Sequence, residues 1–249
     1  MPYIINLSTI HAYSIDETVS AFAKICNKYS RGCLQCTPHF FRNGTNYLWV
    51  MAQYKWHYKS LIEPYKLGRI STEQFLDNLA QIFYFLNGMD IDRRNNLLRE
   101  AWNASIQMNE MTRERFVQVM EMAKTEPVYL ISNTNELNIQ AVLDCFRQNF
   151  PELSFNERID TNIKDDKNPV EILPNVFLCL SYRYKAFKTE YPTTGNLLEE
   201  LIQHTGRHVT VVSQYENDLK KASELGVTET HKAQDFFGRY YSMEATPLI

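Results

Sequence analysis

The second half of the chain alternates between short apolar segments and amphipathic segments, and this alternation limits the possible folds more than any other feature. Each of three apolar segments, "VYLIS" (128–132), "NVFLCL" (175–180) and "HVTVVS" (208–213), is followed by apolar residues at helical spacing. Repeated strand and helix predict a mainly parallel sheet with helices on both faces. A fourth apolar segment, "YIIN" (3–6), is expected to join this sheet, so we expect an α/β fold.

Polar residues follow each of the four expected strands. Ligands of open parallel sheets bind outside the carboxyl ends of the strands, so these polar residues are expected to line one crevice. The candidate site residues are Asn6, Ser8, Ser132, Asn133, Lys188, Ser213 and Gln214.

Residues 14–109, between the first strand and the alternating region, have helical patterns throughout. "GRISTEQF" predicts a helix that begins at Ser71 with a capping box completed by Gln74. Five aromatic residues follow closely on one another in the preceding segment. They are expected to pack in a helical core rather than to form a partner-binding surface, and the partner surface is kept as the alternative. They are Tyr47, Trp49, Tyr54, Trp56 and Tyr58.

These motifs resemble the haloacid dehalogenase (HAD) superfamily, in particular the branch of bacterial sugar-phosphate phosphatases and the amino-terminal domain of mammalian epoxide hydrolase. "YLISNTNE", "LSYRYKAFKTE" and "VTVVSQYENDLKKASELGV" look like the second, third and fourth motifs of that branch, and "GRISTEQF" is similar to a stretch of its helical cap. The resemblance implies a three-layer, Rossmann-like core from residues 1–13 and 110–249. It also implies an inserted all-helical cap over residues 14–109.

The resemblance also implies roles for the polar residues, and here the sequence departs from the family. The family has an aspartate nucleophile, a second acid, a Ser or Thr, a lysine and one or two further acids that help to hold magnesium. The corresponding positions are, in that order, Asn6, Ser8, Ser132 with Asn133, Lys188, and Ser213 with Gln214. A carboxamide is a poor nucleophile, and magnesium is held through carboxylates, so we expect neither an acyl-phosphate intermediate nor a bound metal.

We therefore expect a catalytically inactive HAD-like binding or regulatory module with a metal-independent anion pocket around Lys188. The alternative is an atypical metal-independent hydrolase or transferase for a phosphorylated small molecule, using His11, Lys188 or a cap cysteine. For His11 a structural role is favoured.

Three alternatives remain open for Lys188: it binds the anion, it pairs with a carboxylate such as Glu190 or Glu216, or it points to solvent. Asp218 or Glu216 can also point into the pocket.

Four potential zinc ligands lie close together in the sequence: Cys26, Cys33, Cys36 and His39. No second paired knuckle accompanies them. The aromatic, helix-like character of this region also disfavours a zinc site. The five cysteines of the chain are an odd number without an export signal, which favours reduced thiols over a disulfide framework.

Composition excludes several other classes of protein. A formal net charge of −3 does not favour nucleic acid, and no apolar segment is long enough to span a membrane. The start of the sequence lacks a secretory signal pattern, so a cytoplasmic protein is expected, with the cap as a possible protein-binding surface. A third hypothesis, a bacterial effector secreted into a host cell, rests on the expected flexible tail "YYSMEATPLI" (240–249).

Residues 151–174 are expected to form a surface excursion, in which Asp165 and Asp166 belong to a solvated charge cluster.

Overall fold

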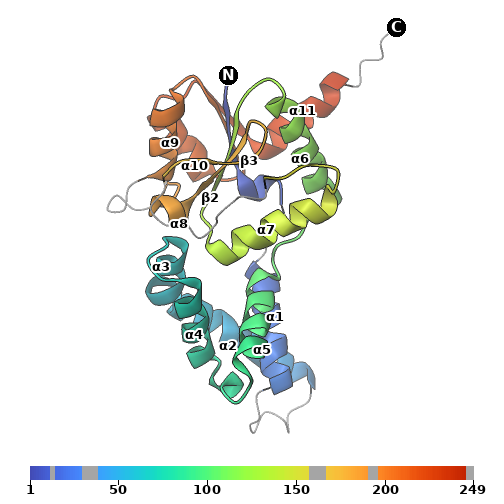
Figure 1. Cartoon of the computed structure of the whole chain (residues 1–249), viewed down its shortest axis with the longest axis vertical. Helices are drawn as coiled ribbons and strands as arrows, with labels where there is room; N and C mark the ends of the chain where they lie inside the picture. Colours follow the sequence, from blue (N-terminus) through green and yellow to red (C-terminus); the bar gives the residue numbers. More distant parts are fainter. Residues whose placement is uncertain (12–14, 30–38, 157–166, 190–195, 245–249) are drawn as a thin grey trace.

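The computed structural model describes residues 1–11, 15–29, 39–156, 167–189 and 196–244, which form a sheet with flanking helices and a bundle of helices below it (Figure 1). The strands are β1 (Tyr3–Asn6), β2 (Val128–Ser132), β3 (Val170–Leu173), β4 (Val176–Leu180), β5 (Thr210–Ser213) and β6 (Glu229–Lys232). The helices of the bundle are α1 (Ile15–Tyr29), α2 (His39–Trp56), a π-helical turn (Tyr58–Ile62), α3 (Glu63–Lys66), α4 (Thr72–Ile82), a 3₁₀ turn (Tyr84–Leu86) and α5 (Ile91–Asn103). The helices of the sheet region are a 3₁₀ turn (Leu7–Thr9), α6 (Glu110–Ala123), α7 (Glu136–Asn149), α8 (Ser181–Tyr184), α9 (Leu197–Thr205), α10 (Glu216–Glu224) and α11 (Ala233–Glu244).

The sheet has the strand order β3-β4-β2-β1-β5-β6, and every neighbouring pair is parallel except β3 with β4. The central strand β1 pairs with β2 on one side, where Ile5 faces Leu130, and with β5 on the other. The expected α/β fold with a mainly parallel sheet is confirmed.

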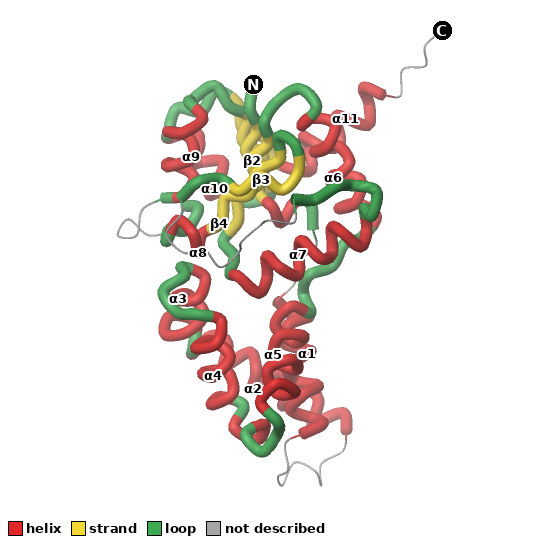
Figure 2. The backbone as a smooth tube through the Cα atoms, in the orientation of Figure 1, coloured by secondary structure: helices red, strands yellow, loops and turns green. Residues whose placement is uncertain are grey.

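Successive residues of each strand point to opposite faces of the sheet, and a separate hydrophobic cluster covers each face. Ile5 and Leu130 pack against α6, α7 and α11, whereas Ile4 and Ile131 pack against α9 and α10. The sheet is therefore the middle of three layers, and Figure 2 shows the strands between the two sets of helices. The inner strands β1, β2 and β4 are largely buried on both faces, which explains why their sequences are nearly continuous apolar runs.

The antiparallel strand β3 lies inside residues 151–174, where the sequence analysis expected only a surface excursion. That expectation was wrong for Val170–Leu173, because "LPNV" forms a tight connection from β3 to β4 in which Asn175 has a φ of 61°. Pro followed by Asn is a turn signal that we overlooked. Asp165 and Asp166 lie outside the described residues.

The helices between β1 and α6 have a hydrophobic core of their own. Phe75 stacks on Tyr65 with ring centroids 4.0 Å apart, and Trp102 meets Phe75 edge-on. The capping box predicted at the start of α4 is present, since Ser71 and Gln74 each accept a hydrogen bond from the backbone of the other. The aromatic residues of α2 were expected to be buried in the helical core, but this expectation was wrong for Trp56, which is 83% exposed.

Buried polar contacts join this helical bundle to the carboxyl ends of the strands. The Ser181 hydroxyl lies 2.8 Å from the backbone oxygen of Lys66, and it accepts a hydrogen bond from the Thr134 N–H at 3.0 Å. The Tyr65 hydroxyl accepts a hydrogen bond from the Leu137 N–H at 3.3 Å. One serine therefore links α3 of the bundle to the end of β2.

Helix α11 includes Tyr240–Glu244, so the first half of the segment that was expected to be a flexible tail is helical. Among the described residues, none of the helices has both the length and the apolar character that crossing a membrane would require.

The close approach of the bundle to α8 predicts that Gly68→Ala destabilises the protein. Gly68 has a φ of +63°, and an added Cβ would lie 2.3 Å from the backbone oxygen of Tyr182. Strain and overpacking together should lower the free energy of unfolding by about 2–4 kcal/mol, as measured by urea denaturation.

The matched control for this substitution is Gly88→Ala, because nothing lies within 4 Å of a Cβ added at Gly88. We expect its free energy of unfolding to change by less than about 0.5 kcal/mol. Equal effects of the two substitutions would contradict the tight contact at Gly68.

Candidate functional site

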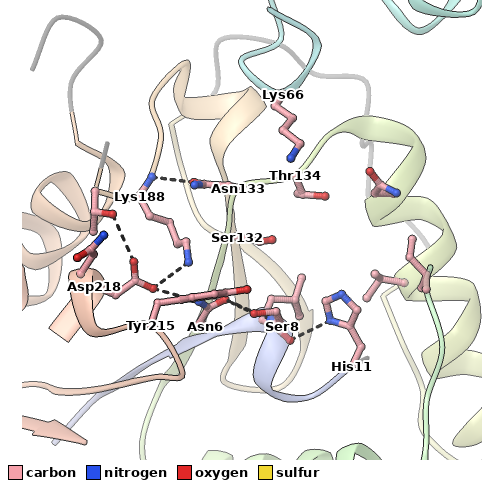
Figure 3. A pocket seen from close by; sticks show the side chains of 16 residues that line it. Asn6, Ser8, His11, Lys66, Ser132, Asn133, Thr134, Lys188, Tyr215 and Asp218 are labelled. Atoms are coloured by element: carbon pink, nitrogen blue, oxygen red, sulfur yellow. Dashed lines mark hydrogen bonds and ion pairs between the residues drawn. The ribbon is translucent and has the colours of Figure 1, made fainter. Parts of the chain in front are cut away.

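A cavity of about 250 Å³ lies where the carboxyl ends of the central strands face the helical bundle (Figure 3). Five of the seven candidate residues from the sequence line it: Asn6, Ser8, Ser132, Asn133 and Lys188. Further lining residues, which the sequence analysis did not select, include Lys66, Thr134, Thr189, Tyr215 and Asn217. Parallel strands end at the same edge of the sheet, which brings together residues far apart in the sequence.

Asn6, which the resemblance placed at the position of a nucleophile, is 2% exposed and has hydrogen bonds at both ends of its carboxamide. Its Nδ2 donates to Asp218 Oδ2 at 3.0 Å and to Ser213 Oγ at 3.2 Å. Its Oδ1 accepts from the Ser8 N–H at 3.2 Å and from the Ser8 hydroxyl at 3.0 Å. The side chain is thus fixed within the protein.

Lys188 forms a buried ion pair with Asp218. Its Nζ lies 2.8 Å from Asp218 Oδ2, and both side chains are 8% exposed. The same Nζ lies 4.9 Å from the centroid of the Tyr215 ring. The backbone N–H of Lys188 donates to Asn133 Oδ1 at 2.7 Å, which holds the lysine beside the end of β2.

This ion pair decides between the alternatives left open for Lys188. A carboxylate does pair with the lysine, but it is Asp218 rather than Glu216, which pairs with Lys232 instead. Glu190 lies outside the described residues. Of the three alternatives, the structure therefore shows the pairing of Lys188 with a carboxylate, and the partner is Asp218.

Asp218 is the acceptor on which the polar network converges. It comes from the first turn of α10, and its Oδ2 accepts hydrogen bonds from Asn6, from Ser213 at 2.7 Å and from Lys188. Its Oδ1 lies 3.4 Å from the Thr189 hydroxyl, which donates to it. The sequence signal for Asp218 was its place in the first helical turn after β5, close to the strand end.

Two candidate residues do not line the cavity. Ser213 is buried beneath Asn6, where it contacts Asp218. Gln214 is exposed and donates from Nε2 to the Ser8 hydroxyl at 3.1 Å. Both residues support the lining residues without facing the cavity.

His11 also lines the cavity. Its Nδ1 donates to the backbone oxygen of Leu7 at 2.9 Å, and burial lowers the pKa of the imidazole to about 4. The ring is therefore neutral at pH 7, in agreement with the structural role favoured from the sequence.

The residues around the cavity do not fit a magnesium ion. Asp218 is the one carboxylate among the described lining residues, and its Oδ2 already accepts three hydrogen bonds, one of them from an ammonium group. Magnesium takes octahedral oxygen ligands and favours carboxylates, and the Lys188 ammonium would repel it. The described residues contain no group of three or more His, Cys, Asp or Glu placed to hold a metal.

The cysteine cluster gives little support for zinc where the structure describes it. Cys26 is buried, and burial raises the pKa of its thiol to about 12. Cys33 and Cys36 lie outside the described residues, and only the backbone of His39 is described.

The parallel sheet, the crevice at its strand ends and the helical bundle inserted after β1 define an α/β protein with a HAD-like fold. Solved structures confirm this fold. A HAD family enzyme from Bacteroides thetaiotaomicron, in complex with magnesium and inorganic phosphate, is 15% identical with a TM-score of 0.59, over 93% of this chain and 92% of that chain. A predicted HAD-like family hydrolase from Porphyromonas gingivalis is 14% identical with a TM-score of 0.53, over 99% and 98% of the two chains. No protein-family model matches the chain, and no curated protein sequence matches it.

The buried ion pair predicts a large effect of Lys188→Met on stability. Removing the ammonium leaves the Asp218 carboxylate without its cationic partner, which should lower the free energy of unfolding by about 3–5 kcal/mol. The double variant Lys188→Met/Asp218→Asn removes both charges and keeps an acceptor for Asn6, so it should be more stable than the single variant. Urea denaturation at pH 7 measures the free energy of unfolding of both variants, and the exposed Lys220→Met is the control. If Lys188→Met lowered this free energy by less than about 1 kcal/mol, the energetic coupling of Lys188 and Asp218 would be contradicted.

Burial of neutral His11 predicts that the protein loses stability below pH 6.5. The unfolded histidine has a pKa near 6.5 and the folded one a pKa of about 4, so the unfolded chain binds more protons between these values. His11 should account for about 2 kcal/mol of the loss between pH 7 and pH 5. Urea denaturation of His11→Asn should show a correspondingly smaller pH dependence, whereas the exposed His208→Asn should behave like the wild type.

Proposed function

We propose that this protein is a binding module with a HAD-like fold that holds an anionic small molecule without a metal and without a covalent intermediate. The observation that carries the proposal is the closed hydrogen-bond network of Asn6, Ser213, Lys188 and Asp218. In this network Asn6, Lys188 and Ser213, at the positions that the resemblance gives to the nucleophile, the lysine and a fourth-motif acid, all contact the carboxylate of Asp218.

The chemistry of Asn6 supports the absence of covalent catalysis. The lone pair of a carboxamide nitrogen is delocalised, and the oxygen of Asn6 accepts two hydrogen bonds from Ser8, so neither atom can act as a carboxylate nucleophile would. Asp218 does not replace it, because its oxygens accept hydrogen bonds from Asn6, Ser213, Lys188 and Thr189.

The lining of the cavity supports an anionic ligand. The described lining residues include two ammonium groups, Lys66 and Lys188, against one carboxylate, Asp218, while His11 is neutral at pH 7. Ser132 and Thr134 add hydroxyl groups, which donate hydrogen bonds to oxyanions. The neighbour from Bacteroides thetaiotaomicron was solved with inorganic phosphate and magnesium. Here the donors suit the phosphate but not the metal.

We also propose that residues 14–109 form a cap domain inserted into a core of residues 1–13 and 110–249. Two observations support this division. The helices α1 to α5 have their own hydrophobic cluster, which Leu137 of α7 joins from the sheet side, and Lys66 of α3 reaches the cavity.

A metal-independent hydrolase or transferase is the second candidate, and the position of His11 is the observation that favours it. With Nδ1–H donated to Leu7, the other ring nitrogen of the neutral imidazole can accept a proton from a water molecule in the cavity. A pKa of about 4 makes this imidazole a weak base, so binding without turnover is the stronger proposal.

A thermal-shift experiment with inorganic phosphate, sulfate and phosphorylated metabolites tests the proposal, with and without a chelator. We expect at least one of these anions to stabilise the protein equally with magnesium and with EDTA. At 100 times its dissociation constant, the ligand should raise the free energy of unfolding by about 2.7 kcal/mol. No shift with any of the anions, or a shift only with magnesium, would overturn the proposal.

Hydrolysis of p-nitrophenyl phosphate separates the two candidates. The binding module should give no turnover with magnesium or with EDTA. Turnover in EDTA that disappears in His11→Asn but persists in His208→Asn would establish the hydrolase instead.

A further inference from the structure

We infer that the ligand carries an aromatic ring next to its anionic group, and that this ring stacks on Tyr215 in the cavity. This inference rests on the proposed function and names the chemical class of the anion: a tetrahedral oxyanion, phosphate or sulfate, esterified to a single aromatic ring. It starts from the observation that Tyr215 places an aromatic side chain, and not only a hydroxyl group, against the cavity.

Tyr215 differs from most of its neighbours in the cavity wall by its exposure. Among the described residues that line the cavity, Tyr215 and Asn217 are the exposed ones, and Tyr215 is 47% exposed. The ring of Tyr215 therefore keeps apolar surface in contact with water. A ligand that covers this surface with a ring of its own gains the free energy of removing both apolar surfaces from water.

The ring is held in place before any ligand binds. The Tyr215 N–H donates to Ser213 Oγ at 3.1 Å, and the backbone oxygen of Tyr215 accepts from the Asp218 and Leu219 N–H groups at 3.2 and 3.4 Å. The Nζ of Lys188 lies 4.9 Å from the ring centroid, and Figure 3 shows Lys188 on one side of the ring. Because these groups are already fixed, stacking on Tyr215 requires little further loss of conformational freedom.

The position of Lys188 also indicates what kind of group stacks on Tyr215. The ammonium attracts the negative π-electron face of the ring on its own side. The π electrons are thereby drawn toward the ammonium, which leaves the opposite face less negative. An electron-rich aromatic ring in an offset arrangement suits such a face, whereas the C–H groups of a saturated ring prefer a more negative one.

The size of the cavity limits the ligand to one ring. Its volume is about 250 Å³, whereas sites for drug-sized ligands have about 300–1,000 Å³. The hydroxyl groups of Ser132 and Thr134 line the same cavity and can donate to the oxygens of the anionic group. An aryl phosphate or aryl sulfate thus uses both the polar lining and the aromatic ring.

Isothermal titration calorimetry in EDTA tests the inference. The probes are inorganic phosphate and sulfate, phenyl phosphate, phenyl sulfate and cyclohexyl phosphate, a saturated control of similar size. The phenyl ester of at least one of the two anions should bind about 10- to 100-fold more tightly than the inorganic anion. Phenyl phosphate should bind about 2- to 10-fold more tightly than cyclohexyl phosphate, which measures the stacking beyond the burial of apolar surface.

Variants of Tyr215 assign this preference to the ring. In Tyr215→Leu, the ratio of the dissociation constants of cyclohexyl and phenyl phosphate should fall to about one, because leucine keeps an apolar side chain but offers no π face. In Tyr215→Phe, which keeps the ring, the ratio should stay at its wild-type value. The matched control is Tyr84→Leu, since Tyr84 is 71% exposed and lies on the helical bundle outside the cavity lining.

Two results would overturn the inference and leave the proposed function standing: wild-type protein that binds phenyl and cyclohexyl phosphate equally, or a preference for phenyl phosphate that persists in Tyr215→Leu. If the wild type binds none of the five probes, the proposed function fails as well. Circular dichroism of each variant confirms that it is folded.

Discussion

The carboxylate of Asp218 is the group on which the arrangement of the site depends. It accepts hydrogen bonds from residues on three separate segments: Asn6 at the end of β1, Ser213 at the end of β5 and Lys188 after α8. A buried carboxylate needs such partners, and each partner is in turn held in place by it. The strand ends are therefore joined by contacts within the protein, in which Lys188 neutralises the charge of Asp218.

This internal pairing changes what the HAD-like fold can offer to a ligand. Lys188 and Asp218 neutralise each other, and the side chains at the end of β2 line the same cavity as Lys66 of α3. The contacts of Ser181 and Gly68 give α3 a fixed place above β2. The helical bundle therefore contributes Lys66 to the lining of the cavity.

Much of the fold could be predicted from the sequence, because its signals are local. Ile4 and Ile5 lie in a continuous apolar run, which indicates a strand buried on both faces, and Ser71 with Gln74 marks the start of α4. The errors were also local. The Pro-Asn turn before β4 was overlooked, and Trp56 was assigned to a core although its helix ends at an exposed surface.

The sequence by itself determined the α/β class, the polar strand ends and the absence of acids at the positions that the HAD resemblance implies. Only the tertiary structure decided which charges pair. Lys188 and Asp218 are 30 positions apart, and Asn6 and Asp218 are 212 apart, so their contacts depend on how β1, α8 and α10 pack around one crevice. The position of Lys66 at the cavity likewise depends on the docking of α3 against α8, for which no periodicity or motif in the sequence gives a signal.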